Sequence, residues 1–210
     1  HIWVGTNGGG INCFNSLAGE FTHYPSTLGD KVASICGFAS GKLLLSIFAQ
    51  GIFIFDPVTG NKQPFTIIDK EVNERLCLHG NTVNVYRNTP NTILLLGNHV
   101  YCYHLKEKQF SIVSEEKGIN IIEGSLKAIA CDGHSTYLND IKHIYELDNH
   151  SNKLRVLFTA QDDMNINSVS MDESGCFWIG SNLGLVSYHP ATQKQKMIST
   201  SLFIEVSSLI

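Results

Sequence analysis

The chain has 210 residues, of which 43% are hydrophobic and 16% charged, and its formal net charge is −4. This length suits one sizeable core or several repeated units that share a stacked one. Lysine and arginine are scattered without a basic stripe, so we expect no contact with nucleic acid. No apolar run is long enough to cross a membrane and no signal peptide opens the chain, so we expect membrane contact only through regions outside this sequence.

Short apolar runs bounded by Gly, Pro, Asn and Asp follow one another along the chain, and their period-2 alternation predicts β-strands. The predicted strands group into units at residues 1–24, 32–66, 83–113, 126–158 and 166–198. The first unit lacks one strand, which either Phe203–Leu209 or sequence upstream of His1 is expected to supply. A longer connector at 67–81 includes Val72 and Leu76, whose spacing predicts a single helical turn.

The units repeat one another. The triplet Trp178-Ile179-Gly180 has counterparts at Tyr137, Leu95, Leu44 and Trp3, each followed by an apolar residue and a small or polar one. A period of about 40 residues with four strands per repeat is typical of a β-propeller. We therefore predict an all-β fold over residues 1–210: a single β-propeller domain, partial or truncated, of four-stranded antiparallel blades with about five blade-equivalents. The repeated position, including both tryptophans, is expected to lie in the packed core between blades.

The repeat resembles the two-component regulator propeller repeat. The matching residues are Val169, Asp172, Gly175, Phe177–Gly180, Gly184-Leu185, Tyr188 and Pro190 in the last unit, Trp3–Thr6 and Gly9–Ile11 in the first, and Phe55–Pro57 with Thr59-Gly60 in the second. The third and fourth units depart from the pattern, because Leu95 and Tyr137 replace the tryptophan.

The resemblance implies the periplasmic sensor region of a bacterial hybrid two-component system histidine kinase, anchored in the inner membrane. Many such sensors bind oligosaccharides released during glycan breakdown. The resemblance therefore implies a sensor that detects an oligosaccharide or another small ligand and regulates glycan-utilisation genes through a kinase outside this chain. It also implies a homodimer of the full-length sensor. No kinase motif occurs in these residues, so this chain itself is not expected to be an enzyme.

Two other functions fit a propeller: a platform for protein interactions, and a polysaccharide lyase or hydrolase. Asp132 and Asp172 can act as acid and base if they face one substrate, but their shared repeat position favours a turn-forming role. His104 and His189 occupy a turn position that Asp56 and Asp148 fill elsewhere.

The nine histidines show no metal-binding spacing and the six cysteines form no C-x-x-C pair, so we expect no metal and no cofactor. The cysteines are expected to be buried thiols that act as small hydrophobic residues.

We expect the ligand at the face where the turns between second and third strands meet the connectors between blades, around the central channel. Side chains there differ from blade to blade, as a site built on a repeated frame requires. The candidates are Asn7, Gln50, His99, Lys142 and Asn182 from the turns, Arg75 and Asn81 from the long connector, and Tyr86. Amide, imidazole and guanidinium groups suit sugar hydroxyls, and the Tyr86 ring can stack on a sugar.

Overall fold

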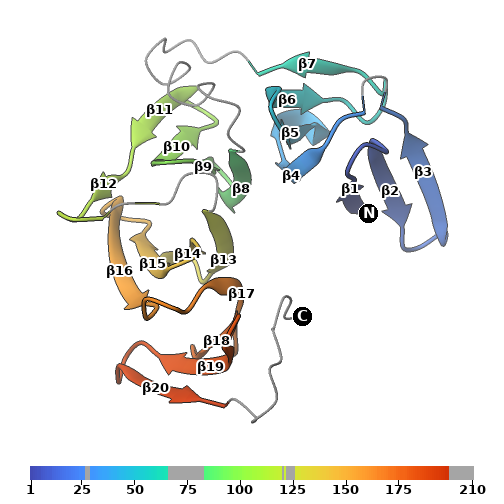
Figure 1. The fold of residues 1–210 in the computed structure, drawn as a ribbon. Helices are drawn as coiled ribbons and strands as arrows, with labels where there is room; N and C mark the ends of the chain where they lie inside the picture. The colour runs from blue at the N-terminus through green and yellow to red at the C-terminus, as the bar shows by residue number, and fades with distance from the viewer. Residues whose placement is uncertain (27–28, 66–82, 120, 122–125, 199–210) are drawn as a thin grey trace. The chain divides into compact units, whose positions relative to one another are not determined.

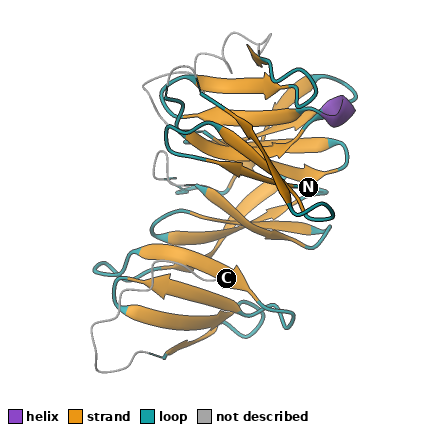
Figure 2. Cartoon of the chain, turned by 90° about the vertical axis from the view of Figure 1, so that its right-hand side faces the viewer, coloured by secondary structure: helices purple, strands orange, loops and turns teal. Residues whose placement is uncertain are grey.

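The computed structural model of the chain describes residues 1–26, 29–65, 83–119, 121 and 126–198. The chain divides into two compact units, His1–Ile112 and Val113–Ile210, which we describe separately. Strands form nearly all of the regular structure (Figure 2), and the helical segment within the described ranges is the short 3₁₀ turn η1 (Ala39–Gly41). Over these same ranges, no helix has the length and apolar character needed to span a membrane.

The first unit contains three sheets within the described residues, and their strands follow one another along the chain (Figure 1). The strands are β1 (Ile2–Gly5), β2 (Ile11–Asn15) and β3 (Glu20–Tyr24); β4 (Val32–Gly37), β5 (Leu43–Ile47), β6 (Gly51–Phe55) and β7 (Lys62–Pro64); and β8 (Asn84–Thr89), β9 (Thr92–Leu96), β10 (Val100–His104) and β11 (Gln109–Ile112). Neighbouring strands in each sheet pair antiparallel.

The second unit contains two sheets in its described part. Their strands are β12 (Ser114–Glu115), β13 (Lys127–Cys131), β14 (Ser135–Asn139), β15 (His143–Asp148) and β16 (Lys153–Thr159); and β17 (Ile166–Met171), β18 (Phe177–Ser181), β19 (Gly184–His189) and β20 (Lys194–Met197). The last four strands form a simple antiparallel meander. The fourth sheet has one strand more than predicted, because β12 pairs parallel with β16 at its outer edge.

This succession of antiparallel meanders confirms the predicted fold class, an all-β propeller in which each sheet is one blade. The first sheet has three strands, β1 to β3, within the described residues. The strand expected at Phe203–Leu209 and the helical turn expected at Val72–Leu76 lie outside these residues.

Within each unit, consecutive sheets pack through apolar side chains that alternate along each strand. Leu44 and Leu95 are both fully buried in one cluster between the second and third sheets. They therefore lie on facing surfaces of different sheets, and the predicted equivalence of the two positions is wrong. Side chains alternate between the two faces of a strand, so an alignment that is one residue out assigns a side chain to the opposite face. Their expected place in the core between blades is confirmed.

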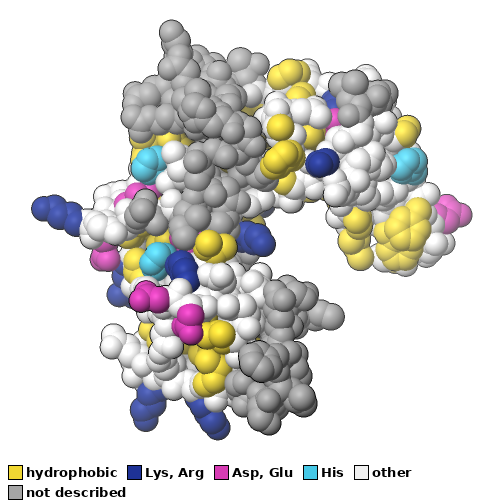
Figure 3. All heavy atoms as spheres, viewed as in Figure 1, with side chains coloured by type: hydrophobic (Ala, Val, Ile, Leu, Met, Phe, Trp, Pro, Cys, Tyr) yellow, Lys and Arg dark blue, Asp and Glu magenta, His cyan; other side chains and the backbone are white. Residues whose placement is uncertain are grey.

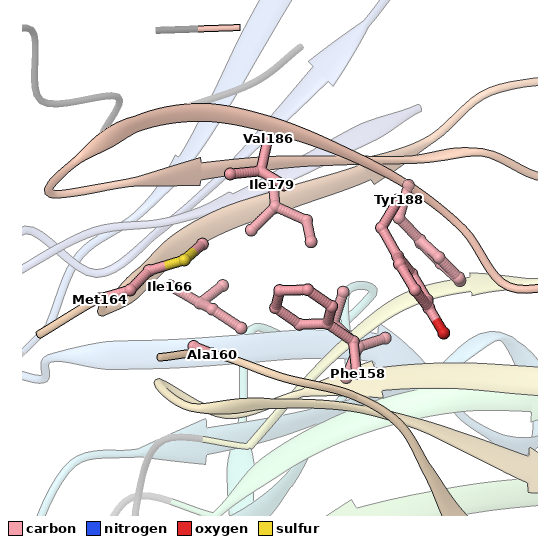
Figure 4. Packing of buried hydrophobic residues seen from close by; sticks show 9 residues of the cluster. Phe158, Ala160, Met164, Ile166, Ile179, Val186 and Tyr188 are labelled. Atoms are coloured by element: carbon pink, nitrogen blue, oxygen red, sulfur yellow. The ribbon is translucent and has the colours of Figure 1, made fainter. Parts of the chain in front are cut away.

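The two tryptophans have different surroundings. Trp3 packs in the core between the first two sheets, with ring centroids 5.8 Å from Tyr24 and 6.1 Å from Phe55, as expected. Trp178 follows Phe177, which is fully buried in the cluster between the fourth and fifth sheets. Figure 4 shows other members of this cluster, among them Ile179 and Val186. Because side chains alternate between the two faces of a strand, Trp178 lies on the other face of its sheet, and it is half-buried, as Trp3 is. Its expected core position is not observed among the described residues.

Among the described residues, the cysteines form no disulfide bond. Cys13, Cys36 and Cys102 are buried as expected, whereas Cys131 and Cys176 are only half-buried. Burial raises the pKa of Cys36 to about 12 and that of Cys102 to about 11, so these thiols stay protonated and unreactive at neutral pH.

Candidate ligand-binding surface

Asp132 and Asp172 each close the hairpin that joins the first two strands of a blade. Oδ1 of Asp132 accepts hydrogen bonds from the amides two and three residues later, at 2.9 and 2.7 Å. Oδ1 of Asp172 accepts from the amides of Ser174 and Cys176, at 2.9 and 3.1 Å. Hydrogen bonds from the Ser174 hydroxyl and the Trp178 indole, together with that from Cys176, hold the pKa of Asp172 at about 2. The turn-forming role is confirmed, and each carboxylate is held within its own hairpin.

The position at the end of the third strand also caps a turn where it holds an aspartate or, as at Asn15, an asparagine. Oδ1 of Asp56 accepts from the amides two and three residues later, at 2.9 and 3.4 Å, and Asp148 does the same at 2.9 and 2.7 Å. His104 differs: its Nε2 lies 3.0 Å from the Ser111 hydroxyl on the neighbouring strand. Within the residues the structure describes, no three His, Cys, Asp or Glu side chains gather as metal ligands.

In the first unit, two of the predicted ligand residues hold the connector between β3 and β4. Asn7, in the β1–β2 turn, forms a backbone bridge with Lys31. Gln50, in the β5–β6 turn, donates from Nε2 to Oδ1 of Asp30 at 3.0 Å. Asp30 is buried and also receives a hydrogen bond from Lys62. These contacts and the one with Ser26 lower the pKa of Asp30, although burial, the largest influence, acts in the opposite direction.

The second unit repeats this arrangement at the connector between β16 and β17. The ammonium group of Lys142, in the β14–β15 turn, donates to the carbonyl oxygens of Asp162 at 2.9 Å and Met164 at 2.6 Å. Asn182, in the β18–β19 turn, accepts from the amide of Asn165 at 2.6 Å and donates to the carbonyl of Asp163 at 2.9 Å. In each unit, therefore, the turns before and after a connector fasten it from both sides.

Two more predicted ligand residues, Tyr86 and His99, belong to the third sheet and its β9–β10 turn. Tyr86 lies half-buried on β8, opposite Leu94 on β9. The ring of His99 stands at 89° to that of Tyr101, with centroids 6.4 Å apart. Arg75 and Asn81 lie outside the described residues.

A polar cluster that the sequence did not single out lies beneath the β14–β15 turn. Asp140 is fully buried and accepts from the backbone amides of Lys142 and His143, at 2.7 and 2.6 Å. The hydroxyl of Tyr145 donates to Oδ2 of Asp140 at 2.7 Å and lies 3.1 Å from Nδ1 of His143. Burial and the neighbouring carboxylate raise the pKa of Tyr145 well above its usual range. The cluster rigidifies the turn from which Lys142 reaches the connector.

The connector of the second unit offers exposed polar groups beside a cavity. Gln161, Asp162, Asp163 and Asn165 are all exposed. A cavity of about 230 Å³ opens next to them, and its lining combines Gln161 with apolar side chains that include Met164. Amides and carboxylates next to an apolar wall can bind hydroxyl groups and the C–H faces of a small neutral ligand.

Comparisons with known proteins agree with the fold. No protein-family model matches this sequence, and no curated protein matches it. Among solved structures, the extracellular domain of BT4673 from B. thetaiotaomicron has a TM-score of 0.69 at 17% identity over 95% of this chain. BT4673 is described as a one-component system with one of its structures and as a hybrid two-component system with another. The extracellular domain of the hybrid two-component system BT3049, from the same organism, has a TM-score of 0.66 at 14% identity over 98% of this chain.

A lyase shares the fold. Virginiamycin B lyase from Staphylococcus aureus has a TM-score of 0.66 at 12% identity, over 95% of this chain and 66% of its own. The chain spans 26% of the BT4673 domain and 28% of the BT3049 domain. At such identities the likeness is one of fold, and it defines the chain as a β-propeller protein.

Proposed function

We propose that this chain is the ligand-binding part of an extracytoplasmic sensor of the hybrid two-component type. The observation that carries the proposal is the likeness, over 95 and 98% of the chain, to extracellular domains of BT4673 and BT3049. The repeat pattern of the sequence supports the same class independently. In this proposal the chain is the periplasmic part of an inner-membrane protein, dimeric at full length, that signals through a histidine kinase elsewhere in the protein.

The ligand we propose is an oligosaccharide, whose detection regulates glycan-utilisation genes. Exposed amide and carboxylate groups around the fastened connectors support a ligand rich in hydroxyl groups. The scattered basic residues and the net charge of −4 argue against a polyanion. A neutral glycan should bind with little dependence on salt, because no ion pair forms across the interface.

Calorimetric titration with oligosaccharide pools from several plant and host glycans tests this proposal. We expect heat from one pool, at low and at high salt alike. Gln161→Ala, at the cavity beside the connector, should weaken binding, whereas Gln109→Ala, at an exposed position of β11, should not. Absence of heat with every pool would contradict a glycan sensor.

One observation favours the alternative of a protein-interaction platform. Ile2, Val4 and Phe21 on the first sheet are 57, 44 and 67% exposed, and Figure 3 shows hydrophobic side chains gathered over this sheet. An exposed apolar patch is typical of an interaction surface. Sedimentation would reveal self-association of the chain, and Phe21→Ser should abolish it if this face is the contact.

The likeness to virginiamycin B lyase favours a third candidate, a propeller lyase or hydrolase acting on a polysaccharide. Incubation with the same glycans distinguishes it, because a lyase releases unsaturated products and a hydrolase new reducing ends. The sensor proposal predicts neither product.

A further inference from the structure

A second cavity in the unit Val113–Ile210, of about 310 Å³, lies between the fourth and fifth blades. Tyr137, Glu146 and Arg155 line one side of the cavity. They lie next to one another on the same face of three adjacent strands, because Tyr137 pairs with Glu146 and Glu146 with Arg155 in the sheet register. Tyr188 and Pro190, at the end of β19, contribute to the other side. None of these residues belongs to the turns and connectors described above.

Each polar side chain of the first wall is held in place by a neighbour. Arg155 donates from Nε and Nη2 to Oε2 of Glu146, at 2.7 and 2.5 Å. Oε1 of Glu146 accepts from the Ser135 hydroxyl at 2.6 Å, and the Tyr137 hydroxyl donates to Oδ2 of Asp132 at 3.2 Å. Polar groups fixed before a ligand arrives lose little conformational entropy on binding. The wall is therefore a preorganised surface and not a set of free solvated side chains.

The charges around the cavity restrict the chemistry of the ligand. Arg155 is 59% exposed. Its guanidinium group has five N–H donors, which is more than the two contacts with Glu146 use. The carboxylates of Glu146 and Glu116 act on this cation and that of Asp132 binds Tyr137, so the negative charge at this wall disfavours an anion. A cationic ligand would be repelled by the positive charge of the guanidinium itself. A neutral molecule with several hydroxyl groups avoids both penalties, and the ring of Tyr137 offers it an apolar surface.

We propose that this cavity binds one neutral sugar ring, with hydroxyl groups on Arg155 and Glu146 and a C–H face against Tyr137. The inference rests on the proposed carbohydrate-sensing function and gives it a second contact point. A glycan bound there would touch the facing sheets of two adjacent blades, so its binding would respond to any change in the packing of the blades.

The test follows the arginine side-chain N–H signals of the full chain by NMR during titration with methyl α-glucoside, methyl β-galactoside, methyl α-mannoside and methyl β-xyloside. The sequence contains only Arg75, Arg87 and Arg155, so the spectrum is simple, and Arg155→Met identifies the signal of Arg155. We expect that signal to shift with at least one glycoside. Arg155→Lys keeps the charge but loses the planar fork, and should weaken binding by at least about tenfold.

Lys153→Met is the matched control, since Lys153 lies on the same strand two residues away, is exposed, and does not line the cavity. It should leave the affinity unchanged. If glycosides or glycan pools move backbone signals near Gln161 and Asn182 but not Arg155, the sensor proposal stands and this inference is wrong. If no sugar moves any signal, both are wrong. A shift of Arg155 with inorganic phosphate alone would also overturn the inference, because the cavity would then be an anion site.

Discussion

The indole Nε1 of Trp178 donates a 2.8 Å hydrogen bond to Oδ2 of Asp172, the carboxylate that also closes the β17–β18 hairpin. The preceding blade repeats this contact, with the hydroxyl of Tyr137 donating to Oδ2 of Asp132 at 3.2 Å. One oxygen of each aspartate thus binds the turn and the other binds the aromatic residue of the following strand. The pair couples hairpin geometry to the orientation of the aromatic ring.

Trp178→Phe should raise the pKa of Asp172 from about 2 towards its usual value, because the indole is one of the donors that stabilise the charged carboxylate. Titration of the Asp172 carboxyl carbon by NMR measures the shift. Trp3→Phe is the control, since Trp3 packs against Tyr24 and Phe55, far along the chain from Asp172. An unchanged Asp172 pKa in Trp178→Phe would mean that the indole contributes nothing.

Turn aspartates should make the protein sensitive to acid. The folded state lowers the pKa values of Asp132, Asp148 and Asp172, in each case chiefly through hydrogen bonds. Groups with lowered folded-state pKa values stabilise the protein above the unfolded value of about 3.9, and this contribution disappears as the pH falls through the folded values. The free energy of unfolding, measured with urea, should contain a constant contribution from these aspartates near neutral pH. This contribution should decline below about pH 4.

Asp172→Asn refines this test. It keeps a side-chain oxygen that can accept from the turn, as Asn15 does in the first blade with the amide of Leu17 at 3.1 Å, but it removes the charge. The acid decline should therefore become shallower without loss of the fold. An unchanged slope would exclude Asp172 as a source of the acid sensitivity.

Leu44→Ala should lower the free energy of unfolding by about 2–5 kcal/mol, because Leu44 is fully buried and the deletion leaves a cavity between blades. Leu17→Ala is the control: Leu17 is 98% exposed, and its replacement should change stability by no more than about 0.5 kcal/mol. Chemical denaturation measures both. Combining Leu44→Ala with Leu95→Ala should give a non-additive loss, because both side chains belong to one cluster.

Gly10→Ala should destabilise the first blade more than Gly19→Ala does. Both glycines have positive φ values, 85° and 70°, so alanine is strained at either position. At Gly10 the new Cβ would also lie 2.2 Å from the carbonyl oxygen of Tyr24, whereas at Gly19 it meets no atom within 4 Å. Gly19→Ala should cost about 1–2 kcal/mol and Gly10→Ala clearly more, measured by thermal unfolding. Equal effects would show that the Gly10 turn adapts.

Lys142→Met should loosen the connector of the second unit, because it removes the ammonium donor to the carbonyls of Asp162 and Met164 while keeping the aliphatic stem. Hydrogen exchange should become faster at Ile166, whose amide bonds to the carbonyl of Ile141 in the same turn. Lys127→Met, at an exposed position of β13, should leave exchange at Ile166 unchanged. Equal exchange in both variants would mean that Lys142 does not fasten the connector.

Local patterns predicted the blades and their turns well, because both depend on residues close in sequence. Asp132 and Asp172 satisfy amides within four positions of themselves, so their repeat position was enough to assign their role. The orientation of Leu95 was not predictable in this way. A degenerate repeat gives no marker of register, and a shift of one residue reverses the face of the side chain.

The candidate ligand residues show a different limit. Gln50, Lys142 and Asn182 stand at positions that vary between blades, and such variation predicts ligand contact. In the structure each binds a connector whose own sequence also varies. Variation between repeats therefore has a structural cause here, and only the distances between turn and connector reveal it. Their part in ligand binding stays a prediction.

The parallel pairing of β12 with β16 has a consequence for solubility. An outermost strand exposes unpaired amide and carbonyl groups that can recruit another chain, and β12 covers part of that edge on the fourth blade. The outermost strand of the fifth blade, β20, instead carries Lys194 and Lys196, which repel a second copy approaching edge to edge. The two blades of this unit thus guard against aggregation by different means, one by backbone pairing and the other by like charge.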